Sequence, residues 1–520
     1  MKKNLQQTSS SAIFVVFSSN VLSKIIGFLL VVVFASTVGT SSDGDAYTFA
    51  FILPDLVNHL LAGSALSIAF IPIFQELSDN QEKQNRFFSN IFTIGTIVFV
   101  SVLLICFFAT PFFVKILAGN SITTNIQTFE LTVKLTRIVL PAQLFFFWGA
   151  IFIGVQQANK NYKFSALAPI VYDTIIIIFG LVFFKFIGIA GFSWGVLFGA
   201  FVGHTLIQFF GAKRFSIKYS PYINIKDKDF LQWFYKTIPL ALGLGITFSN
   251  EFTFRFFGSR IENGQGAIVA LNYAYKIVMI IVVLFGSSIA GTIYPFLSEK
   301  AKEKKYDEME NFLIPIFVKT TTIIIIITAT IYPISGDIIS LLFERKAFDS
   351  QSVILTSKAL IGYLPGIFFL SAVIILQRLF YAIKNTKTPL IISTVSLILS
   401  IPFYKILSDL WGIIGISSAT SVFSAIATIL TVWRWHKFYP HTKLLSAVKP
   451  VLIAILIAAV VVIIEFCTIR IIREFMFIRI LRVCLISFPA ITFSAIMFQF
   501  FKIIDIKDLF TKTVRKVVRR

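Results

Sequence analysis

The chain has little charge for its length. Of its 520 residues only 14% are Asp, Glu, Lys or Arg, whereas 57% are hydrophobic and 60 are Phe. A typical soluble domain contains about 25% charged residues, which cover the surface around its apolar core. The composition therefore excludes a soluble globular enzyme, a disordered chain and a fibrous protein. It indicates an all-α polytopic membrane protein.

Residues and motifs that carry catalytic or metal chemistry are also scarce. The three cysteines, Cys106, Cys467 and Cys484, lie singly in apolar runs and form no CxxC motif, and there are only four histidines. The sequence contains no GxxxxGK[ST], HExxH or GxSxG motif and no paired carboxylate motif. We therefore expect no metal, no cofactor and no ATP hydrolysis, and we interpret the chain as a transporter rather than an enzyme.

The apolar residues fall into runs long enough to cross a bilayer. A membrane-spanning helix needs about 20 mostly apolar residues, and this window predicts fourteen helices. They lie near residues 11–37, 45–75, 89–115, 131–155, 164–184, 188–210, 231–257, 267–297, 312–333, 353–382, 388–407, 412–433, 446–469 and 476–501.

The basic residues predict the orientation of these spans. With the N-terminus in the cytoplasm, the inner connecting segments hold 26 Lys and Arg residues and the outer ones hold six. Because positive residues stay on the cytoplasmic side, both termini are predicted to be cytoplasmic. The net charge of +22 is explained by loops that face anionic membrane lipids, so we expect no nucleic-acid partner.

An internal repeat divides the predicted spans. The run Gly63-Ser64-Ala65-Leu66…Pro72…Glu76 recurs at an offset of 223 as Gly286-Ser287-Ser288-Ile289…Pro295…Glu299. A second set recurs at an offset of 224, with Pro141, Phe145, Ala158, Lys160, Asn161 and Lys163 falling on Pro365, Phe369, Ala382, Lys384, Asn385 and Lys387. A repeat of six helices keeps the same orientation, so the two copies are predicted to be parallel and to enclose a transport pathway.

The repeat and the spans divide the chain into four parts. We predict an N-terminal six-helix lobe at 1–222, a C-terminal six-helix lobe at 223–440, two additional transmembrane helices at 441–502 and a basic cytoplasmic tail at 503–520. No connecting segment is long enough to form a catalytic domain outside the membrane, so the helices must carry the function.

Ionisable side chains inside the spans are candidate functional residues, because each is costly unless it meets a cavity or a partner. Lys24 and Lys276 lie well inside their spans without an acidic residue three or four positions away. We expect both to face a hydrated cavity and to suit an anionic substrate such as a phosphate or diphosphate. The other candidates, each with a simpler explanation as a local pair or a side chain that reaches the surface, are Asp45, Asp55, His59, Lys134, Arg137, Asp173, Glu251, Arg255 and Arg378.

Several segments resemble a known family. The second span contains Asp45-Ala46-Tyr47…Phe49-Ala50-Phe51…Leu53-Pro54…Ala65…Ser67…Phe70-Ile71-Pro72. Similar segments occur at Ser23-Lys24…Gly27-Phe28, Phe164…Ala168-Pro169, Phe343-Glu344-Arg345…Ala347-Phe348 and Phe380-Tyr381-Ala382…Lys384-Asn385-Thr386-Lys387-Thr388-Pro389. The ordered set, over roughly residues 12–435, resembles the MurJ (MviN) lipid II flippases of the multidrug/oligosaccharidyl-lipid/polysaccharide exporter superfamily.

The resemblance implies a function and a place in the cell. It implies a flippase in the bacterial inner membrane that moves lipid II, an undecaprenyl-diphosphate-linked peptidoglycan precursor, to the outer leaflet by alternating access. By this resemblance, Lys24 and Lys276 match arginine positions of the family's central cavity, and Asp45 matches the family's acidic residue in the second helix. Asn58, His59, Arg255, Glu251 and Arg378 complete the expected substrate-binding set. We expect a monomer, although the sequence leaves the oligomeric state open.

Departures from the family pattern keep an alternative open. Leu30, Asn58 and His59 stand where the family often has arginine, and Gly63 stands where it has an acidic residue. Lysine at positions 24 and 276 keeps the charge but lacks the two-pronged geometry that fits phosphate. The alternative is therefore a flippase for another polyprenyl-diphosphate-linked glycan, of the O-antigen or surface-polysaccharide type. A membrane glycan polymerase or ligase is disfavoured by the short outer segments.

Overall fold

A computed structural model describes residues 2–59, 65–215, 217–247, 249–261 and 264–472, with six further residues at 489, 492–494 and 496–497. In these ranges all regular secondary structure is helical, and no β-strand occurs. The chain forms two compact units: unit 1 is Met1–Val269 with Arg345–Phe348, and unit 2 is Ala270–Glu344 with Asp349–Arg520. The lobes expected at 1–222 and 223–440 are defined by the repeat and stay a prediction.

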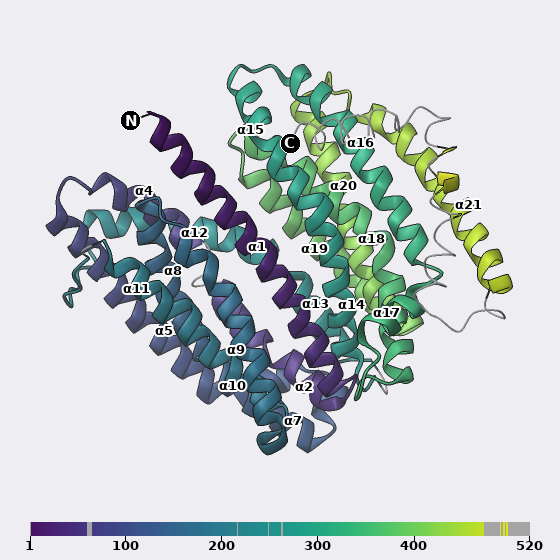
Figure 1. Cartoon of the computed structure of the whole chain (residues 1–520), viewed down its shortest axis with the longest axis horizontal. Helices are drawn as coiled ribbons and strands as arrows, with labels where there is room; N and C mark the ends of the chain where they lie inside the picture. The colour runs from purple at the N-terminus through teal and green to yellow at the C-terminus, as the bar shows by residue number, and fades with distance from the viewer. Residues whose placement is uncertain are drawn as a thin grey trace. The chain divides into compact units, whose positions relative to one another are not determined.

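Unit 1 is a bundle of apolar helices. Its elements are α1 (Lys2–Val38), α2 (Ser42–Ala50), α3 (Ile52–Val57), α4 (Ala65–Glu76), α5 (Gln81–Leu117), α6 (Asn120–Thr123), α7 (Ile126–Val139), α8 (Ala142–Ala158), α9 (Lys163–Ile187), α10 (Ala190–Gly199), η2 (Ala200–Leu206), α11 (Ile207–Lys213), α12 (Lys228–Thr247) and α13 (Ser249–Gly258). Helix α9 packs along both α1 and α10, and α4 packs against α8 and α12 (Figure 1).

Aromatic side chains fill the core of unit 1. Phe70 of α4 is fully buried and stacks on Phe74 and on Phe87 of α5, with ring centroids 4.9 and 5.3 Å apart. Phe147 of α8 is also buried and stacks on Phe99 at 4.5 Å. Such ring pairs contribute beyond the area that they bury, which explains how a chain so rich in phenylalanine holds α4, α5 and α8 together.

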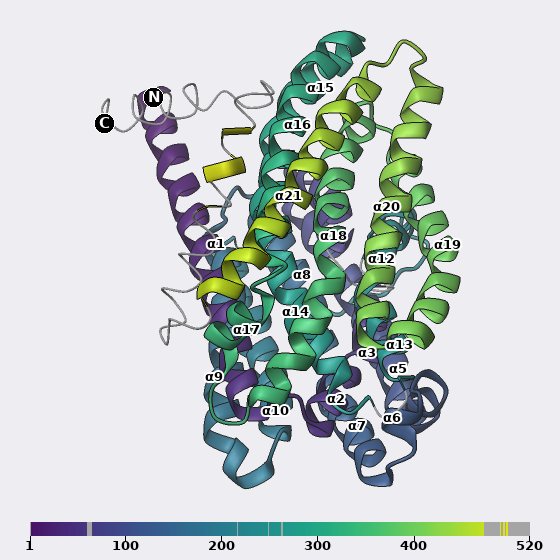
Figure 2. The ribbon, with the colours of Figure 1, turned by 90° about the vertical axis from the view of Figure 1, so that its right-hand side faces the viewer.

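Unit 2 is built around one long buried helix. Its elements are α14 (Ala267–Ile281, of which residues 270 onward belong here), η3 (Val282–Ser287), α15 (Ser288–Lys302), α16 (Tyr306–Ile331), α17 (Ser335–Phe343), α18 (Ser350–Ala382), α19 (Lys387–Trp411), α20 (Ile413–Phe438), η4 (Leu444–Ala447) and α21 (Val448–Ile472). Helix α18 packs against α15, α16, α17 and α20, while α19 packs against α20 and α21 against α16 (Figure 2).

Small polar side chains join α18 to α20. The Ser421 hydroxyl donates to the Gly362 carbonyl at 2.8 Å, and the Thr428 hydroxyl donates to the Phe369 carbonyl at 3.0 Å. Small residues let membrane helices approach closely, and hydroxyl groups then bond across the contact. At one end of α20, the buried carboxyl of Glu310 accepts from the Trp435 indole and from the Lys443 backbone, both at 2.6 Å. These bonds fix α16 to the end of α20.

Eleven of the fourteen predicted spans correspond to helices that are long and apolar enough to cross a membrane, counted within the described residues. The other three are not among these eleven. The predicted span 45–75 is interrupted between α2 and α3, and its residues 60–64 lie outside the described residues, as does residue 248 of the predicted span 231–257, which contains α12 and α13. The predicted span 476–501 and the basic tail lie outside the described residues, apart from a few positions of the span.

Proline explains the interruption between α2 and α3. Helix α2 begins at Ser42, where the Ser41 hydroxyl accepts from the Gly44 N–H, and it ends at Ala50. Pro54 lies four residues after Ala50 and has no N–H to donate to its carbonyl. A broken helix inside a membrane protein is tolerated where protein or a cavity surrounds it, and such breaks mark binding sites in transporters.

The helix boundaries reproduce the internal repeat. The α7–α8 segment, Ile126 to Ala158, corresponds to α18, Ser350 to Ala382, and α9 at Lys163–Ile187 corresponds to α19 at Lys387–Trp411. Every one of these boundaries shifts by the same offset of 224. The repeat predicted from a handful of side chains therefore extends to the starts and ends of whole helices.

The turns of the repeat match as closely as the helices. The Asn125 side chain accepts from backbone N–H groups at the start of α7, and Asp349 does the same for α18. Lys160 and Lys384 both adopt a positive φ, 57° and 59°, just after α8 and α18. Equivalent local geometry at equivalent positions indicates that the α7–α9 segment and the α18–α19 segment follow one structural plan, while the six-helix extent of the repeat stays a prediction.

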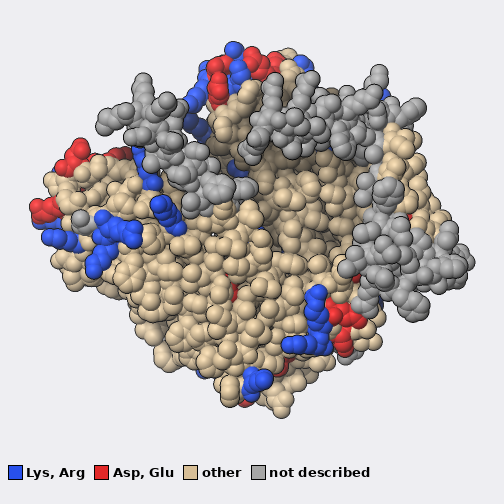
Figure 3. Space-filling model, viewed as in Figure 1, with Lys and Arg blue, Asp and Glu red and all other residues tan. Residues whose placement is uncertain are grey.

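The surface agrees with a membrane environment. On the face drawn in Figure 3, Lys, Arg, Asp and Glu gather in a few groups and leave wide areas without charge. Large apolar side chains are exposed on many helices, for example Phe108 at 72% and Phe186 at 79%. Exposed apolar surface on this scale is unusual in a soluble monomer, whereas a bilayer covers it.

Candidate functional site

Asp45 of α2 connects two distant parts of unit 1. Its side chain is buried, and its carboxyl oxygens accept from the Gly266 N–H at 2.6 Å and from the Val269 N–H at 2.9 Å. These are orphan donors at the start of α14, which begins at Ala267. An acidic group there also meets the positive end of the helix dipole. The geometry gives Asp45 a positioning role, and a contact with substrate stays a prediction.

Arg255 of α13 forms ion pairs with two carboxyl groups. Its guanidinium donates to Asp55 at 2.6 Å and to Glu251 at 3.0 Å, and only 8% of the Arg255 side chain is exposed. Glu251 lies one turn away on the same helix, whereas Asp55 belongs to α3 and lies 200 residues earlier. A buried arginine needs such partners because an uncompensated charge is costly. Much of the positive charge of Arg255 is therefore neutralised.

His59 and Asn58 directly follow α3, and His59 borders this cluster. Both side chains are half-buried, and His59 lies within electrostatic range of Asp55, Glu251 and Arg255. The Asn58 N–H donates to backbone carbonyls of α3. Asp55, His59, Glu251 and Arg255 form a polar cluster at the broken second span, and this cluster connects α3 to α13.

Lys24 lies on α1 and is exposed. Within the described residues its ammonium group has no hydrogen bond and no ion pair, so its charge is available to a ligand. Farther along the same helix, α1 approaches α9 at Gly27: a Cβ there would lie 3.2 Å from a carboxyl oxygen of Asp173. The hydrated surrounding expected for Lys24 from the sequence stays a prediction.

Lys276 and Arg378 belong to unit 2. Lys276 is half-buried on α14, next to the buried Tyr275. Arg378 lies near the end of α18, with its guanidinium carbon 5.8 Å from the ring centre of Tyr294 and 5.6 Å from that of Tyr381. Aromatic faces stabilise a guanidinium without neutralising it. Whether these two cations and Lys24 serve one ligand stays a prediction.

The structure brings together residues that sequence reasoning kept separate. Asp55 with His59, and Glu251 with Arg255, were interpreted as two local pairs, but Arg255 bonds to a carboxyl from each pair. A contact between residues 200 positions apart has no signal in one sequence. The capping of α14 by Asp45 was missed for the same reason. No group of three His, Cys, Asp or Glu in the described ranges could hold a metal ion.

Comparison with solved structures shows the fold. A lipid II flippase MurJ in an inward closed conformation superposes with a TM-score of 0.78 over 94% of this chain and 99% of that chain, at 24% identity. An inward-facing multidrug-resistance transporter of the MATE family, within the MOP superfamily, superposes with a TM-score of 0.64 over 82% of this chain and 95% of that one, at 14% identity. The predicted all-α polytopic membrane fold is confirmed, whereas the count of fourteen helices stays a prediction.

Comparison with curated sequences shows the family. The probable lipid II flippase MurJ of Bdellovibrio bacteriovorus is 24% identical over 89% of this chain and 88% of its own length. The protein of the same name from Rickettsia prowazekii is 27% identical over 77% of this chain and 78% of its own. The family model described as lipid II flippase MurJ matches residues 34–485. Since this match covers most of the sequence, the chain belongs to the MurJ lipid II flippase family.

Proposed function

We propose that this member of the family is a flippase that moves lipid II from the inner to the outer leaflet of the bacterial inner membrane. The observation that carries the proposal is the family match over residues 34–485. Relatives from several bacteria bear the name lipid II flippase. Because lipid II is a peptidoglycan precursor, this function is the transport of such a precursor. Transport makes and breaks no bond in the substrate.

The substrate sets the physical problem that the chain must solve. A diphosphate carries negative charge that is very costly in hydrocarbon, so its path needs water, cations or both. Lys24 supplies an exposed cation without a partner among the described residues, and Arg378 supplies one held over tyrosine rings. Lys276 is the third proposed contact, on the half-buried face of α14. We assign these three residues to the diphosphate.

The remaining candidates support the path rather than contact the phosphates. Arg255 is occupied by Asp55 and Glu251, and this cluster connects the broken second span to α13. Asp45 holds the start of α14, the helix that carries Lys276. Interrupted helices supply positions where a transporter helix bends. Alternating access is proposed to use the interruption between α2 and α3 in the predicted span 45–75.

One observation favours a second candidate, a flippase for another polyprenyl-diphosphate-linked glycan. The family arginine positions filled by Leu30, Asn58 and His59 leave fewer cations, and Arg255 is neutralised by its neighbours. The diphosphate is shared by both candidate substrates, so only the glycan distinguishes them. This candidate ranks second because the relatives are named for lipid II.

The orientation also stays a proposal. The excess of Lys and Arg in the inner segments supports a cytoplasmic location for both termini. A cytoplasm-dependent reporter fused after Arg520 should therefore be active. An inactive C-terminal reporter on a stable fusion would contradict this orientation.

Complementation tests the function. Expression of this chain should restore growth to a bacterial strain depleted of its own lipid II flippase. Lys24→Ala and Lys24→Gln should fail at wild-type membrane levels, because they remove a charge that nothing else replaces. Lys24→Arg should succeed, since it keeps the charge and adds a geometry that fits phosphate.

A matched variant controls for loss of any exposed cation. Lys185 is exposed near the end of α9, and Lys185→Ala should restore growth as well as the wild type. Failure of the wild-type chain at good membrane expression would shift the assignment to the second candidate. Normal growth with Lys24→Ala would refute the role of this lysine while leaving the function intact.

A further inference from the structure

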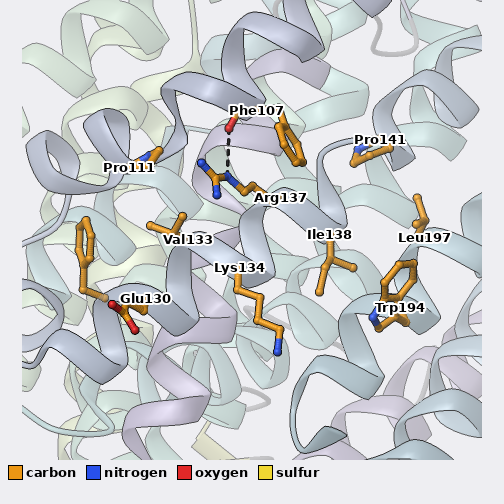
Figure 4. A pocket seen from close by; sticks show the side chains of 11 residues that line it. Phe107, Pro111, Glu130, Val133, Lys134, Arg137, Ile138, Pro141, Trp194 and Leu197 are labelled. Carbon is orange, nitrogen blue, oxygen red and sulfur yellow. Dashed lines mark hydrogen bonds between the residues drawn. The ribbon is translucent and has the colours of Figure 1, made fainter.

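A pocket of about 740 Å³ opens on unit 1, apart from the residues assigned to transport. Its walls come from α5, α7 and α10 and from the α7–α8 junction (Figure 4). Its ionisable lining residues are Glu130, Lys134 and Arg137, all on α7. The rest of the lining is apolar or aromatic, including Pro111, Trp194 and Leu197. The pocket thus combines two cations and one carboxylate with an apolar wall.

Arg137 is fixed in place by a defect in α5. Pro111 has no N–H, so the carbonyl of Phe107, four residues before it, loses its helical partner. The Nε of Arg137 donates to that carbonyl at 3.1 Å (Figure 4), and the guanidinium carbon lies 5.2 Å from the centre of the Phe107 ring. The two Nη groups make no hydrogen bond to the described part of the chain. The guanidinium is therefore oriented, and its strongest phosphate-binding donors remain available.

Lys134 lies three residues before Arg137 on α7 and is exposed. It forms no ion pair with Glu130, although the spacing of four residues would allow one, and no other partner occurs among the described residues. Figure 4 shows the lysine extending away from Arg137 on the same lining. The pocket therefore offers two separate cationic groups and keeps a net positive charge.

The surroundings of the pocket are those of a lipid-facing surface. On α5, Phe108 and Phe112 are exposed by 72% and 62%, and on α10 Trp194 and Phe198 are exposed by 38% and 44%. In a bilayer such side chains contact acyl chains, and tryptophan prefers the level of the headgroups. Helices α5 and α7 are both among the membrane-spanning segments. A ligand that enters this pocket from the membrane meets a continuous apolar wall beside the two cations.

We propose that this pocket binds the phosphate headgroup of an anionic membrane phospholipid. Arg137 and Lys134 bind the headgroup, and the apolar wall formed by Pro111, Trp194 and Leu197 contacts the acyl chain. Charge complementarity selects an anionic lipid over a zwitterionic one, and the apolar wall selects a lipid over free phosphate. On the predicted topology the pocket faces the outer half of the bilayer. Bound lipid would stabilise the contact of α7 with α5 and α10.

Photocrosslinking tests the site. The full chain, purified in detergent, is incubated with a phosphatidylglycerol that carries a photoreactive acyl chain, and the labelled peptides are mapped by mass spectrometry. Label is expected on α7 and α10. Unlabelled phosphatidylglycerol should compete, whereas phosphatidylcholine with the same chains and inorganic phosphate should not. Lys134→Gln should weaken competition by unlabelled phosphatidylglycerol about tenfold, which is the effect of losing one charge-assisted bond.

Two matched variants separate this site from general attraction to basic protein. Lys115→Gln removes an exposed cation of α5 that does not line the pocket, and its labelling should equal that of the wild type. Lys134→Arg keeps the charge and should also label normally. If unlabelled phosphatidylglycerol competes equally well in Lys134→Gln and wild type, or if phosphatidylcholine competes as well as phosphatidylglycerol, the proposal is overturned. Displacement by lipid II at lower concentration than by phosphatidylglycerol would assign the pocket to the transported lipid and overturn it as well.

Discussion

Asp45 shows how one residue can be located from the sequence while its role comes from the structure. The sequence places an acidic group at the start of the second span, and the resemblance makes it a candidate for substrate binding. The structure shows its two carboxyl oxygens occupied by Gly266 and Val269, 221 and 224 residues later. Sequence patterns report neighbours within a few turns of a helix, so a partner that far along the chain could not be predicted.

The capping role predicts a loss of stability when Asp45 is changed. Asp45→Asn keeps one acceptor oxygen but turns an amide group toward the other N–H at the start of α14. A buried donor loses its partner, which should lower the free energy of unfolding by about 2 kcal/mol. Thermal unfolding in detergent measures this loss. Asp43→Asn, at an exposed position two residues earlier on α2, should unfold like the wild type.

A different result would change the interpretation of Asp45. If Asp45→Asn unfolds at the wild-type temperature but no longer complements the flippase-depleted strain, the carboxyl acts on the substrate or on a coupled ion. Reduced stability with partial activity, recovered at low temperature, is the outcome that the capping geometry predicts.

Helices were the most predictable elements of this fold. Eleven predicted spans match membrane-length helices, because hydropathy averaged over about 20 residues reports the burial of a whole helix in lipid. The same averaging hides a break inside a span, so 45–75 was predicted as one helix although Pro54 marks the interruption between α2 and α3. The repeat was visible in the sequence, but the equivalence of its helix caps and turns was found only from the backbone geometry of the structure.

Two equivalent glycines test the repeat at the scale of the turn. Gly188 follows α9 with φ 61° and ψ −146°, and Gly412, at the equivalent position of the second copy, follows α19 with φ 55° and ψ −124°. These backbone angles are strained for any residue with a Cβ. A Cβ at either position would meet no atom within 4 Å, so backbone strain is the only reason why a substitution should lower stability. Gly188→Ala and Gly412→Ala should each lower the free energy of unfolding by about 1–3 kcal/mol.

A third glycine is the control for these two. Gly291 also has open space around a Cβ, but it lies inside α15 with ordinary helical geometry. Gly291→Ala should leave stability unchanged or raise it by up to about 1 kcal/mol, because alanine favours the helix. Denaturation of the three variants side by side measures the contrast. Similar stability of all three would contradict the strain at the two turns.

At the scale of the whole molecule, the chain combines an apolar exterior with a small set of cations in its helices. The fold and the family follow from the sequence with little ambiguity, since composition, spans and ordered segments agree. The site follows less completely. Lys24 is exposed, Arg255 is tied to two carboxyl groups and Asp45 to a helix terminus, and the contact of Lys24 with substrate stays a prediction. A charged residue that pairs with a distant partner holds helices together, whereas one without such a partner can contact a ligand. A single sequence does not show which charged residues pair over such distances.

The most direct test of the account is the exposure of lipid II on the outer leaflet. In cells depleted of their own flippase and supplied with this chain, an external enzyme that cleaves lipid II should release the soluble headgroup at the level of undepleted cells. Lys24→Ala at equal membrane level should reduce the release to that of depleted cells, and Lys24→Arg should restore it. Release that stays at the depleted level with the wild-type chain present would contradict the claim that this protein moves lipid II.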